Sequence, residues 1–218
     1  MSELNQLLLD LDHKKNFNDH DYYVSKSNYF AFNIVEKWPK WEKKILNICG
    51  EKFSGKTHLA NIFKSKSKAL LIYQNEINDD VFKKIKLFES IIIDGFNNNL
   101  NEKLIYSIFN LVDQDNKYML INSEKPINEI EFKLPDMISR SKNCLVAKIE
   151  SPDDDLIFAI ILKNFSDRQI KLEKKIIEFI INRIDRSYSK ICEFIYKVDE
   201  LSLKKKKPIN LKTIREIL

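Results

Sequence analysis

The chain has 218 residues and a formal net charge of +5, with 44% hydrophobic and 32% charged residues. This length suits one α/β domain with a small appendage, and the composition is typical of a soluble protein. The longest apolar runs are too short to cross a membrane, and the polar N-terminus does not resemble a signal peptide, so we expect a cytoplasmic protein without membrane contact. The 3 cysteines form no C-x-x-C pair, which disfavours a zinc site and a disulfide framework.

The hydrophobic pattern divides the chain into three parts. Residues 1–20 are polar apart from one leucine-rich stretch and are predicted to form a flexible arm, 21–150 alternate strands with helices, and 151–218 contain helices alone. Strands are predicted at 45–49, 69–73, 90–94, 118–122 and 144–149. Helices are predicted at 27–38, 57–65, 79–86, 101–114, 136–141, 153–164, 173–183, 187–201 and 211–218. Strands separated by helical crossovers imply a parallel sheet covered on both faces.

Glycine is rare in this chain, and two of its 3 glycines frame one loop. The loop reads Gly50, Glu51, Lys52, Phe53, Ser54, Gly55, Lys56, Thr57, which fits the pattern G-x-x-x-x-G-K-S/T at every fixed position. It lies between a predicted strand and a predicted helix, where such a loop turns its backbone N–H groups toward phosphate oxygens. We expect Lys56 to contact the β- and γ-phosphates of a nucleotide and Thr57 to ligate Mg²⁺. A chance match in an ordinary turn is the alternative.

Polar residues end two of the later strands. Asp94 is a second candidate ligand for Mg²⁺, or else the first residue of an Asp-Gly turn. The next residue, Gly95, has no side chain that could orient an attacking water, so we expect nucleotide binding with weak intrinsic ATPase activity. Asn122 and Ser123 are candidates for contacting the γ-phosphate or orienting water. The alternative is that they simply end a strand.

These motifs together resemble the AAA+ P-loop ATPases of the DnaA branch, and within it the Hda-type regulatory inactivators of DnaA. The resemblance covers nearly the whole chain and implies a five-stranded parallel sheet of order 5-1-4-3-2, a C-terminal helical lid, and bound ADP or ATP with Mg²⁺. The segment that contains Tyr23, Val24 and Asn28 is similar to the one that encloses adenine, which makes Val24 and Asn28 candidate nucleotide contacts. The family's phosphate-binding lid arginine aligns with Ser189, and Arg186 or Lys190 is the candidate replacement.

Two further stretches resemble segments through which members of this family contact their partners. Leu134-Pro135-Asp136 followed by Ser139-Arg140 is similar to the family stretch whose arginine enters the ATP site of a neighbouring subunit, so Arg140 is the candidate arginine finger in trans. A surface arginine at the end of a short helix is the alternative. Near the N-terminus, Gln6, Leu7, Leu9 and Leu11 are similar to the contact residues of the peptide that binds the DNA polymerase sliding clamp. The alternative for them is an amphipathic segment that folds back on the domain.

The resemblance implies a regulator of chromosomal replication initiation. Such a protein binds the sliding clamp (beta) of DNA polymerase III, reaches DNA through the clamp, and stimulates hydrolysis of the ATP bound to the DnaA initiator. On this interpretation the chain is an activator of a partner's ATPase more than an independent enzyme. The sequence leaves open whether the chain also forms a homo-oligomer. The main alternative is a DnaA-related helicase loader or other remodeller driven by its own hydrolysis, which Gly95 disfavours. A small-molecule P-loop kinase is a third class.

Overall fold

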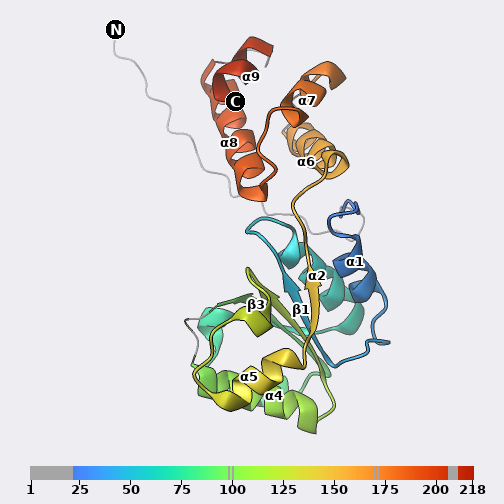
Figure 1. The fold of residues 1–218 in the computed structure, drawn as a ribbon, viewed down its shortest axis with the longest axis vertical. Coiled ribbons are helices and arrows are strands. Elements are labelled where there is room, and N and C mark those ends of the chain that lie inside the picture. The colour runs from blue at the N-terminus through green and yellow to red at the C-terminus, as the bar shows by residue number, and fades with distance from the viewer. Residues whose placement is uncertain (1–21, 98, 100, 169, 171, 206–210) are drawn as a thin grey trace.

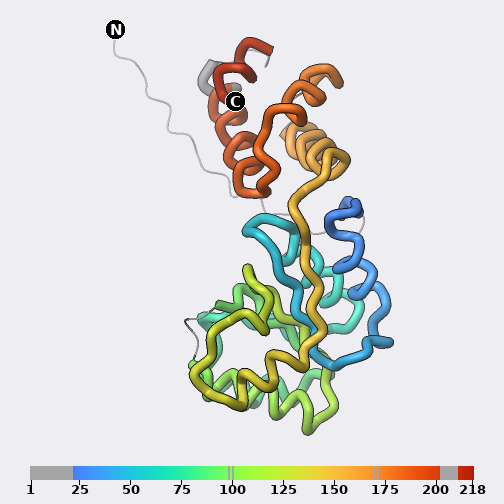
Figure 2. Tube along the Cα trace, in the orientation of Figure 1, coloured from blue at the N-terminus to red at the C-terminus, as the bar shows by residue number. Residues whose placement is uncertain are grey.

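The computed structural model describes residues 22–218 apart from 98, 100, 169, 171 and 206–210. Figure 1 shows an α/β body with a group of helices beyond one edge of its sheet. A short connection, residues 149–153, leads from the last strand into those helices, as the chain trace in Figure 2 shows. The predicted arm at residues 1–20, with the clamp-binding-like peptide at 6–11, lies outside the described residues.

The strands of the body form one parallel sheet. Their bounds are β1 (Ile45–Cys49), β2 (Leu70–Tyr73), β3 (Ser90–Phe96), β4 (Tyr118–Ser123) and β5 (Leu145–Lys148). They pair in the order β2-β3-β4-β1-β5, which is the predicted order 5-1-4-3-2 written from the other edge, so the predicted fold is confirmed. Because the strands are parallel, the residues directly after β1, β3 and β4 meet at the same edge of the sheet, which we call its carboxyl edge.

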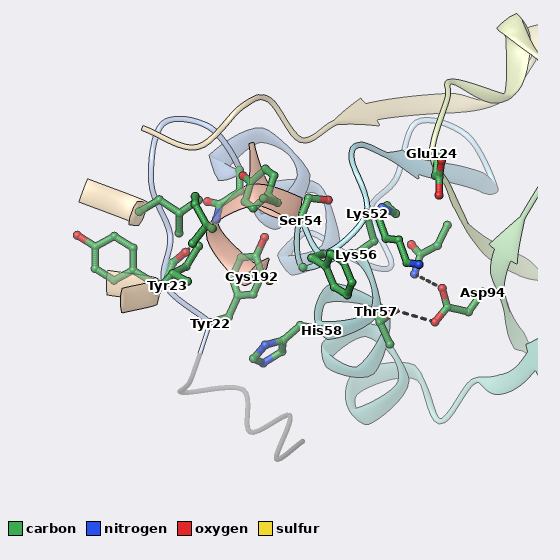
Figure 3. A pocket seen from close by; sticks show the side chains of 18 of the residues that line it. Tyr22, Tyr23, Lys52, Ser54, Lys56, Thr57, His58, Asp94, Glu124 and Cys192 are labelled. Carbon is green, nitrogen blue, oxygen red and sulfur yellow. Dashed lines mark hydrogen bonds between the residues drawn. The ribbon is translucent and has the colours of Figure 1, made fainter. Parts of the chain in front are cut away.

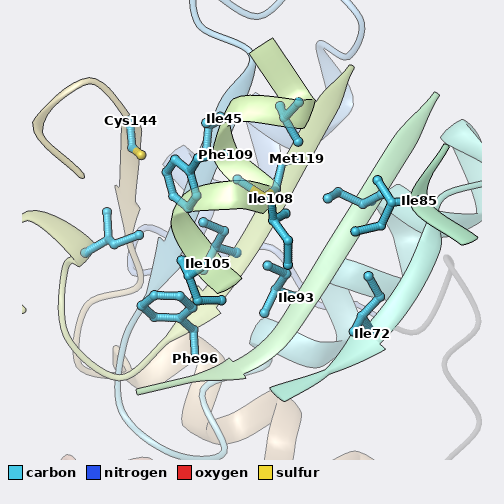
Figure 4. Packing of buried hydrophobic residues seen from close by; sticks show 14 of the residues in the cluster. Ile45, Ile72, Ile85, Ile93, Phe96, Ile105, Ile108, Phe109, Met119 and Cys144 are labelled. Carbon is cyan, nitrogen blue, oxygen red and sulfur yellow. The ribbon is translucent and has the colours of Figure 1, made fainter. Parts of the chain in front are cut away.

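Helices cover both faces of this sheet. α1 (Tyr29–Glu36) and α2 (Lys56–Ser67) lie on one face, and α3 (Val81–Ile85), α4 (Glu102–Gln114) and α5 (Pro135–Lys142) lie on the other. Successive strand residues point to opposite faces, so Ile91 and Ile93 pack toward α4 while Ile92 packs toward α2. Figure 4 shows the α4 side, where Ile105, Ile108 and Phe109 pack against buried residues of the strands.

The ends of the body helices are explained by local chemistry. The side chain of Asn101 caps α4 by accepting a 3.1 Å hydrogen bond from the Lys103 N–H. Pro135 begins α5, where its missing N–H costs nothing. α3 is shorter than predicted, and two 3₁₀ turns, Gln74–Glu76 after β2 and Ile127–Glu129 after β4, lie in the connections between strands and helices.

The third strand extends further than predicted, to Phe96 instead of residue 94. The pairing of β3 with β4 shifts register between Ile93 and Phe96, and Gly95 within this irregularity has a φ of +83°. A left-handed backbone is costly for any residue with a Cβ. The backbone therefore favours glycine after Asp94, in addition to the missing side chain.

The helices beyond the sheet form a second packed unit, which we call the lid. It contains α6 (Asp154–Asp167), α7 (Lys174–Ile181), α8 (Tyr188–Lys205) and α9 (Leu211–Ile217). Its own core includes Ile157, Ile161 and Phe165 of α6 with Ile191 and Val198 of α8. The Asp153 side chain caps α6 through the Leu156 N–H at 2.9 Å. Within the described residues, no helix combines the length and the apolar character that crossing a membrane requires.

Candidate functional site

The phosphate loop, residues 50–57, connects the buried strand β1 to the first turn of α2. Gly55 directly precedes α2 and has a φ of +94°, and a Cβ at this position would lie 3.1 Å from the ring of Tyr22. The left-handed residue lets the chain turn directly into α2, whose first N–H groups have no partner within the helix. This is the geometry of an anion-binding helix N-terminus.

Lys56 spans the phosphate loop from the first turn of α2. Its Nζ donates hydrogen bonds of 2.7 Å each to the carbonyl oxygens of Gly50 and Glu51. Burial lowers the pKa of Lys56, while the carboxylates of Glu124 and Asp94 act in the opposite direction. An ammonium group is thus held beside two acidic side chains at the carboxyl edge of the sheet.

The two residues predicted to ligate magnesium lie in direct contact. Thr57 Oγ1 donates to Asp94 Oδ2 at 2.9 Å, and Asn122 Nδ2 donates to Asp94 Oδ1 at 3.0 Å, so the carboxylate is held from both sides (Figure 3). Among the described residues, Asn122 Oδ1 and Ser54 Oγ are buried without a hydrogen-bond partner. Both residues line the cavity, where a polar group of a ligand could pair with these atoms.

The described residues contain no group of three or more His, Cys, Asp and Glu side chains that could hold a metal ion by themselves. Thr57 and Asp94 nevertheless offer the oxygen atoms that Mg²⁺ prefers. Magnesium commonly takes one or two protein oxygens and completes its shell with phosphates and water. This pair therefore fits an ion that arrives with a nucleotide.

Ser123 plays a different role from Asn122. Its Oγ accepts a 2.8 Å hydrogen bond from Asn47 Nδ2 and donates to the Lys125 carbonyl oxygen at 2.6 Å. Asn47 is fully buried in β1 and also accepts from the Ile127 N–H at 2.8 Å. Ser123 is thus part of a buried network that fixes the turn after β4, although it also borders the cavity.

A cavity of about 1150 Å³ lies between the phosphate loop and the lid. From the body it is lined by Tyr22, Tyr23, Asn28, Ile130 and residues 52–58, 94–97 and 122–125. From the lid it is lined by Leu156, Ala159, Ile160, Lys163, Asn164, Asp167, Arg168, Tyr188, Ile191, Cys192, Ile195 and Tyr196. The lid side of the wall combines apolar and aromatic side chains of α6 and α8 with the polar or charged side chains of Lys163, Asn164, Asp167 and Arg168.

Sequence reasoning did not identify the lid residues of this cavity. They lie three or four positions apart on α6 and on α8, so each helix presents one stripe to the cavity. Residues spaced three or four positions apart can be recognised from helical periodicity. Periodicity alone, however, does not distinguish residues that line the cavity from residues that form the lid core. Tyr22, His58 and Glu124 were also missed, because each lies outside the fixed positions of any motif.

Several of the predicted nucleotide contacts do not line the cavity, or line it with a side chain that is engaged elsewhere. Asn28 borders the cavity, but its side chain is engaged in the turn before α1, accepting from the Ser25 N–H at 2.8 Å and donating to the Tyr23 carbonyl at 2.9 Å. Val24, Gly50 and Glu51 are not among the cavity-lining residues. Arg186 is also absent from the lining, and its guanidinium pairs with Asp154 at 2.7 Å on an exposed surface of the lid.

Arg140 lies apart from the cavity. It belongs to α5, which precedes β5 and lies near the edge of the sheet opposite the phosphate loop (Figure 1). Its guanidinium forms an ion pair with Asp113 and donates a 2.8 Å hydrogen bond to Asn110, both on α4. With 34% of its side chain exposed, Arg140 is oriented by the body and still accessible from outside.

Comparison with known proteins finds replication initiators among the proteins to which this chain is similar. A family model described as the lid domain of Hda matches residues 153–218. The chromosomal replication initiator protein DnaA of Helicobacter hepaticus is 26% identical over 189 residues, which cover 75% of this chain and 41% of that protein. The chain thus spans about two fifths of the length of this relative.

Solved structures agree with the fold. Domain III of the Thermotoga maritima replication initiation protein DnaA superposes with a TM-score of 0.73 at 18% identity, covering 94% of this chain and 96% of that one. AMPPCP-bound DnaA from Aquifex aeolicus superposes with a TM-score of 0.65 at 17% identity, covering 88% of this chain and 67% of that one. At such identities these structures establish the arrangement of the sheet and the lid.

Proposed function

Because the chain is a DnaA/Hda-related AAA+ protein, we propose that it binds ADP or ATP with Mg²⁺ in the cavity between the body and the lid. The loop N–H groups and Lys56 would hold the phosphates, and Thr57 and Asp94 would ligate the ion. A nucleotide-bound form of the similar Aquifex DnaA supports this assignment. So do the buried polar atoms of Ser54 and Asn122 without partners among the described residues.

We further propose that the protein switches off replication initiation by stimulating hydrolysis of the ATP bound to DnaA. The observation that carries this proposal is the separation of Arg140 from the chain's own phosphate loop. An arginine finger must leave its own subunit to neutralise the charge that develops on a neighbour's phosphates. Asn110 and Asp113 hold the guanidinium in place, so little side-chain freedom is lost when it docks.

The arm before the body would supply the second interaction. The stretch with Gln6, Leu7, Leu9 and Leu11 resembles a clamp-binding peptide, and a short apolar peptide in one groove binds with a Kd of roughly 1 μM. A ring-shaped clamp offers several grooves, so several copies of this chain could be held close to DNA without any new contact. DNA contact would then be indirect, through the clamp.

The test is hydrolysis of DnaA-bound ATP in the presence of clamp-loaded DNA, with and without this chain. The proposal expects stimulation that requires both the clamp and the arm. Replacing Gln6, Leu7 and Leu9 with alanine should abolish clamp binding and with it the stimulation, and should leave nucleotide binding unchanged. If the parent chain gives no stimulation on clamp-loaded DNA, the regulatory function is wrong.

One observation favours a second candidate, a remodeller driven by its own hydrolysis. Glu124 lies directly after β4, borders the cavity and is close enough to Lys56 to influence its pKa. A carboxylate in this place could orient a water in the role that Gly95 cannot fill. This candidate expects the isolated protein to turn over ATP at roughly several per second, within the range common among enzymes, and expects Glu124→Gln to abolish that turnover. If the regulatory function is correct, the parent chain and Glu124→Gln should both hydrolyse ATP slowly.

A further inference from the structure

Glu51 of the phosphate loop contacts the beginning of the lid helix α8. Its carboxylate accepts hydrogen bonds from Ser187 Oγ at 2.5 Å, from the Tyr188 N–H at 3.0 Å and from the Ser189 N–H at 3.0 Å. Glu51 and Ser187 are 136 positions apart in the chain. One side chain thus joins the loop that would bind phosphate to the helix that closes the cavity.

The chemistry of this contact is that of a helix cap supplied from elsewhere in the fold. The first N–H groups of a helix have no partner within it, and its N-terminus favours negative charge. Burial opposes ionisation of Glu51, but the hydrogen bonds from Ser187, Ser189 and Tyr188 outweigh that effect and lower its pKa. The carboxylate is therefore matched to the helix end as an anion.

Neighbouring contacts show that the lid is held by the protein's own groups. The Tyr188 hydroxyl donates to the Glu150 carbonyl oxygen at 3.0 Å, beside the Glu51 contact. Arg186, a lid residue with the charge to contact a phosphate, is instead paired with Asp154. The N–H groups of Tyr188 and Ser189 at the start of α8 thus already have an acceptor within the protein, the carboxylate of Glu51. The main chain of Glu51 also accepts a hydrogen bond from Lys56, so the same residue contacts the lysine of the phosphate site.

We propose that Glu51 is a positioning residue that holds the lid against the phosphate loop, independently of the number of phosphates on the nucleotide. The part of this proposal that concerns bound nucleotide rests on the proposed nucleotide site. In the nucleotide-free protein, loss of the Glu51 charge should let α8 separate from the loop. In the nucleotide-bound protein, the same loss should speed the release of ADP and of ATP by the same factor.

The chain contains a suitable reporter of lid opening. Cys192 belongs to α8 and lines the cavity. Burial raises the pKa of Cys49 to about 11 and that of Cys144 to about 12, so these two thiols react slowly. A bulky fluorescent maleimide should therefore label Cys192 first, and the labelling rate measures how often the lid moves away from the loop.

The experiment compares Glu51→Gln with the parent, and with Glu150→Gln as the matched control. Glu150 lies at the same end of the body, and its carboxylate pairs with Lys148 and not with the lid. Without nucleotide, Glu51→Gln should be labelled about tenfold faster, because hydrogen bonds to a charged acceptor are roughly twice as strong as those to a neutral one. Ser187→Ala, which removes one donor, should shift the rate in the same direction by a smaller factor. Glu150→Gln should match the parent.

We call the contact of the Glu51 carboxylate with the start of α8 the latch. Labelling of Cys192 without nucleotide tests the latch, and nucleotide binding and release test the proposed nucleotide site. Unchanged labelling of Cys192 in both Glu51→Gln and Ser187→Ala would overturn the latch. Faster labelling with no ADP or ATP binding by the parent would support the latch and contradict the proposed nucleotide site. Release of a fluorescent ADP or ATP analogue completes the test: a common acceleration in Glu51→Gln supports independence from the terminal phosphate, and an effect limited to ATP overturns that independence.

Discussion

The two ends of the α/β body differ in how their functional groups are held. At the carboxyl edge of the sheet, Lys56, Thr57 and Asp94 come from two separate stretches of the chain and face a large cavity beneath the lid. At the opposite end, Arg140 is fixed by two neighbours on the adjacent helix and faces outward. The first arrangement suits binding a ligand within the chain, and the second suits acting on another molecule. If the proposed functions are correct, we therefore expect nucleotide binding and stimulation of the partner to be separable by mutation.

The largest effect that would test this separation is expected at Arg140. Arg140→Ala should reduce stimulation of ATP hydrolysis in DnaA by a factor on the order of 10³, because a guanidinium that neutralises transition-state charge is removed. ADP binding by this chain should be unchanged in calorimetry. Arg140→Lys should be nearly as defective, since an ammonium lacks the planar fork that grips two oxygens.

Lys142→Ala is the matched control for Arg140, because it removes a positive charge from the same helix at an exposed position. It should leave stimulation close to that of the parent. Equal losses in Arg140→Ala and Lys142→Ala would mean that the basic end of α5 acts as a diffuse charged surface and not through a finger.

The second effect concerns the other end of the body. Lys56→Ala should weaken ADP and ATP binding by at least about 100-fold, since hydrogen bonds to charged groups contribute about 1.5–3 kcal/mol each. Lys52→Ala removes a charge from the exposed side of the same loop and should have a much smaller effect. Calorimetry with ADP measures both, and unchanged affinity in Lys56→Ala would contradict the phosphate site.

A smaller effect is expected at the magnesium pair. Asp94→Asn should weaken nucleotide binding about tenfold when Mg²⁺ is present, because one anionic ligand of the ion is lost. In EDTA the variant and the parent should bind ADP equally. A loss of affinity of the same size in EDTA would show that Asp94 acts by holding Thr57 and Asn122 in place, and not through the ion.

The smallest effect is expected at Gly95. Gly95→Ala should lower the free energy of unfolding by about 1 kcal/mol, because the backbone there is left-handed. Space does not oppose the change, since a Cβ at this position has no described neighbour within 4 Å. Gly95→Asn should cost less, because asparagine tolerates this conformation better than alanine. Urea denaturation measures both, and equal stability of all three proteins would contradict the backbone account.

The sequence best predicted those parts of the candidate site whose residues are close together in the chain. The phosphate loop has its residues in one run, and the strands that carry Asp94 and Asn122 are short apolar segments with clear ends. The order of the strands came from the family resemblance and is confirmed. The contact between Thr57 and Asp94 is then expected from parallel strands ending at one edge.

What the sequence could not predict depends on contacts between distant residues. Nothing local in the stretch around Glu51 indicates that its carboxylate caps a helix that begins at Tyr188. The orientation of Arg186 toward Asp154 likewise depends on how the lid helices pack. The left-handed backbone at Gly95 coincides with a register shift in the pairing of β3 with β4, which no periodicity shows.

The central claim is that the reaction takes place in the partner's site while this chain supplies Arg140. The most direct test loads DnaA with ATP labelled on its γ-phosphate and loads this chain with unlabelled ADP, then monitors single-turnover release of labelled phosphate on clamp-loaded DNA. We expect rapid release from DnaA with the parent chain and slow release with Arg140→Ala. Release that becomes rapid only when this chain itself carries the labelled ATP would contradict the central claim.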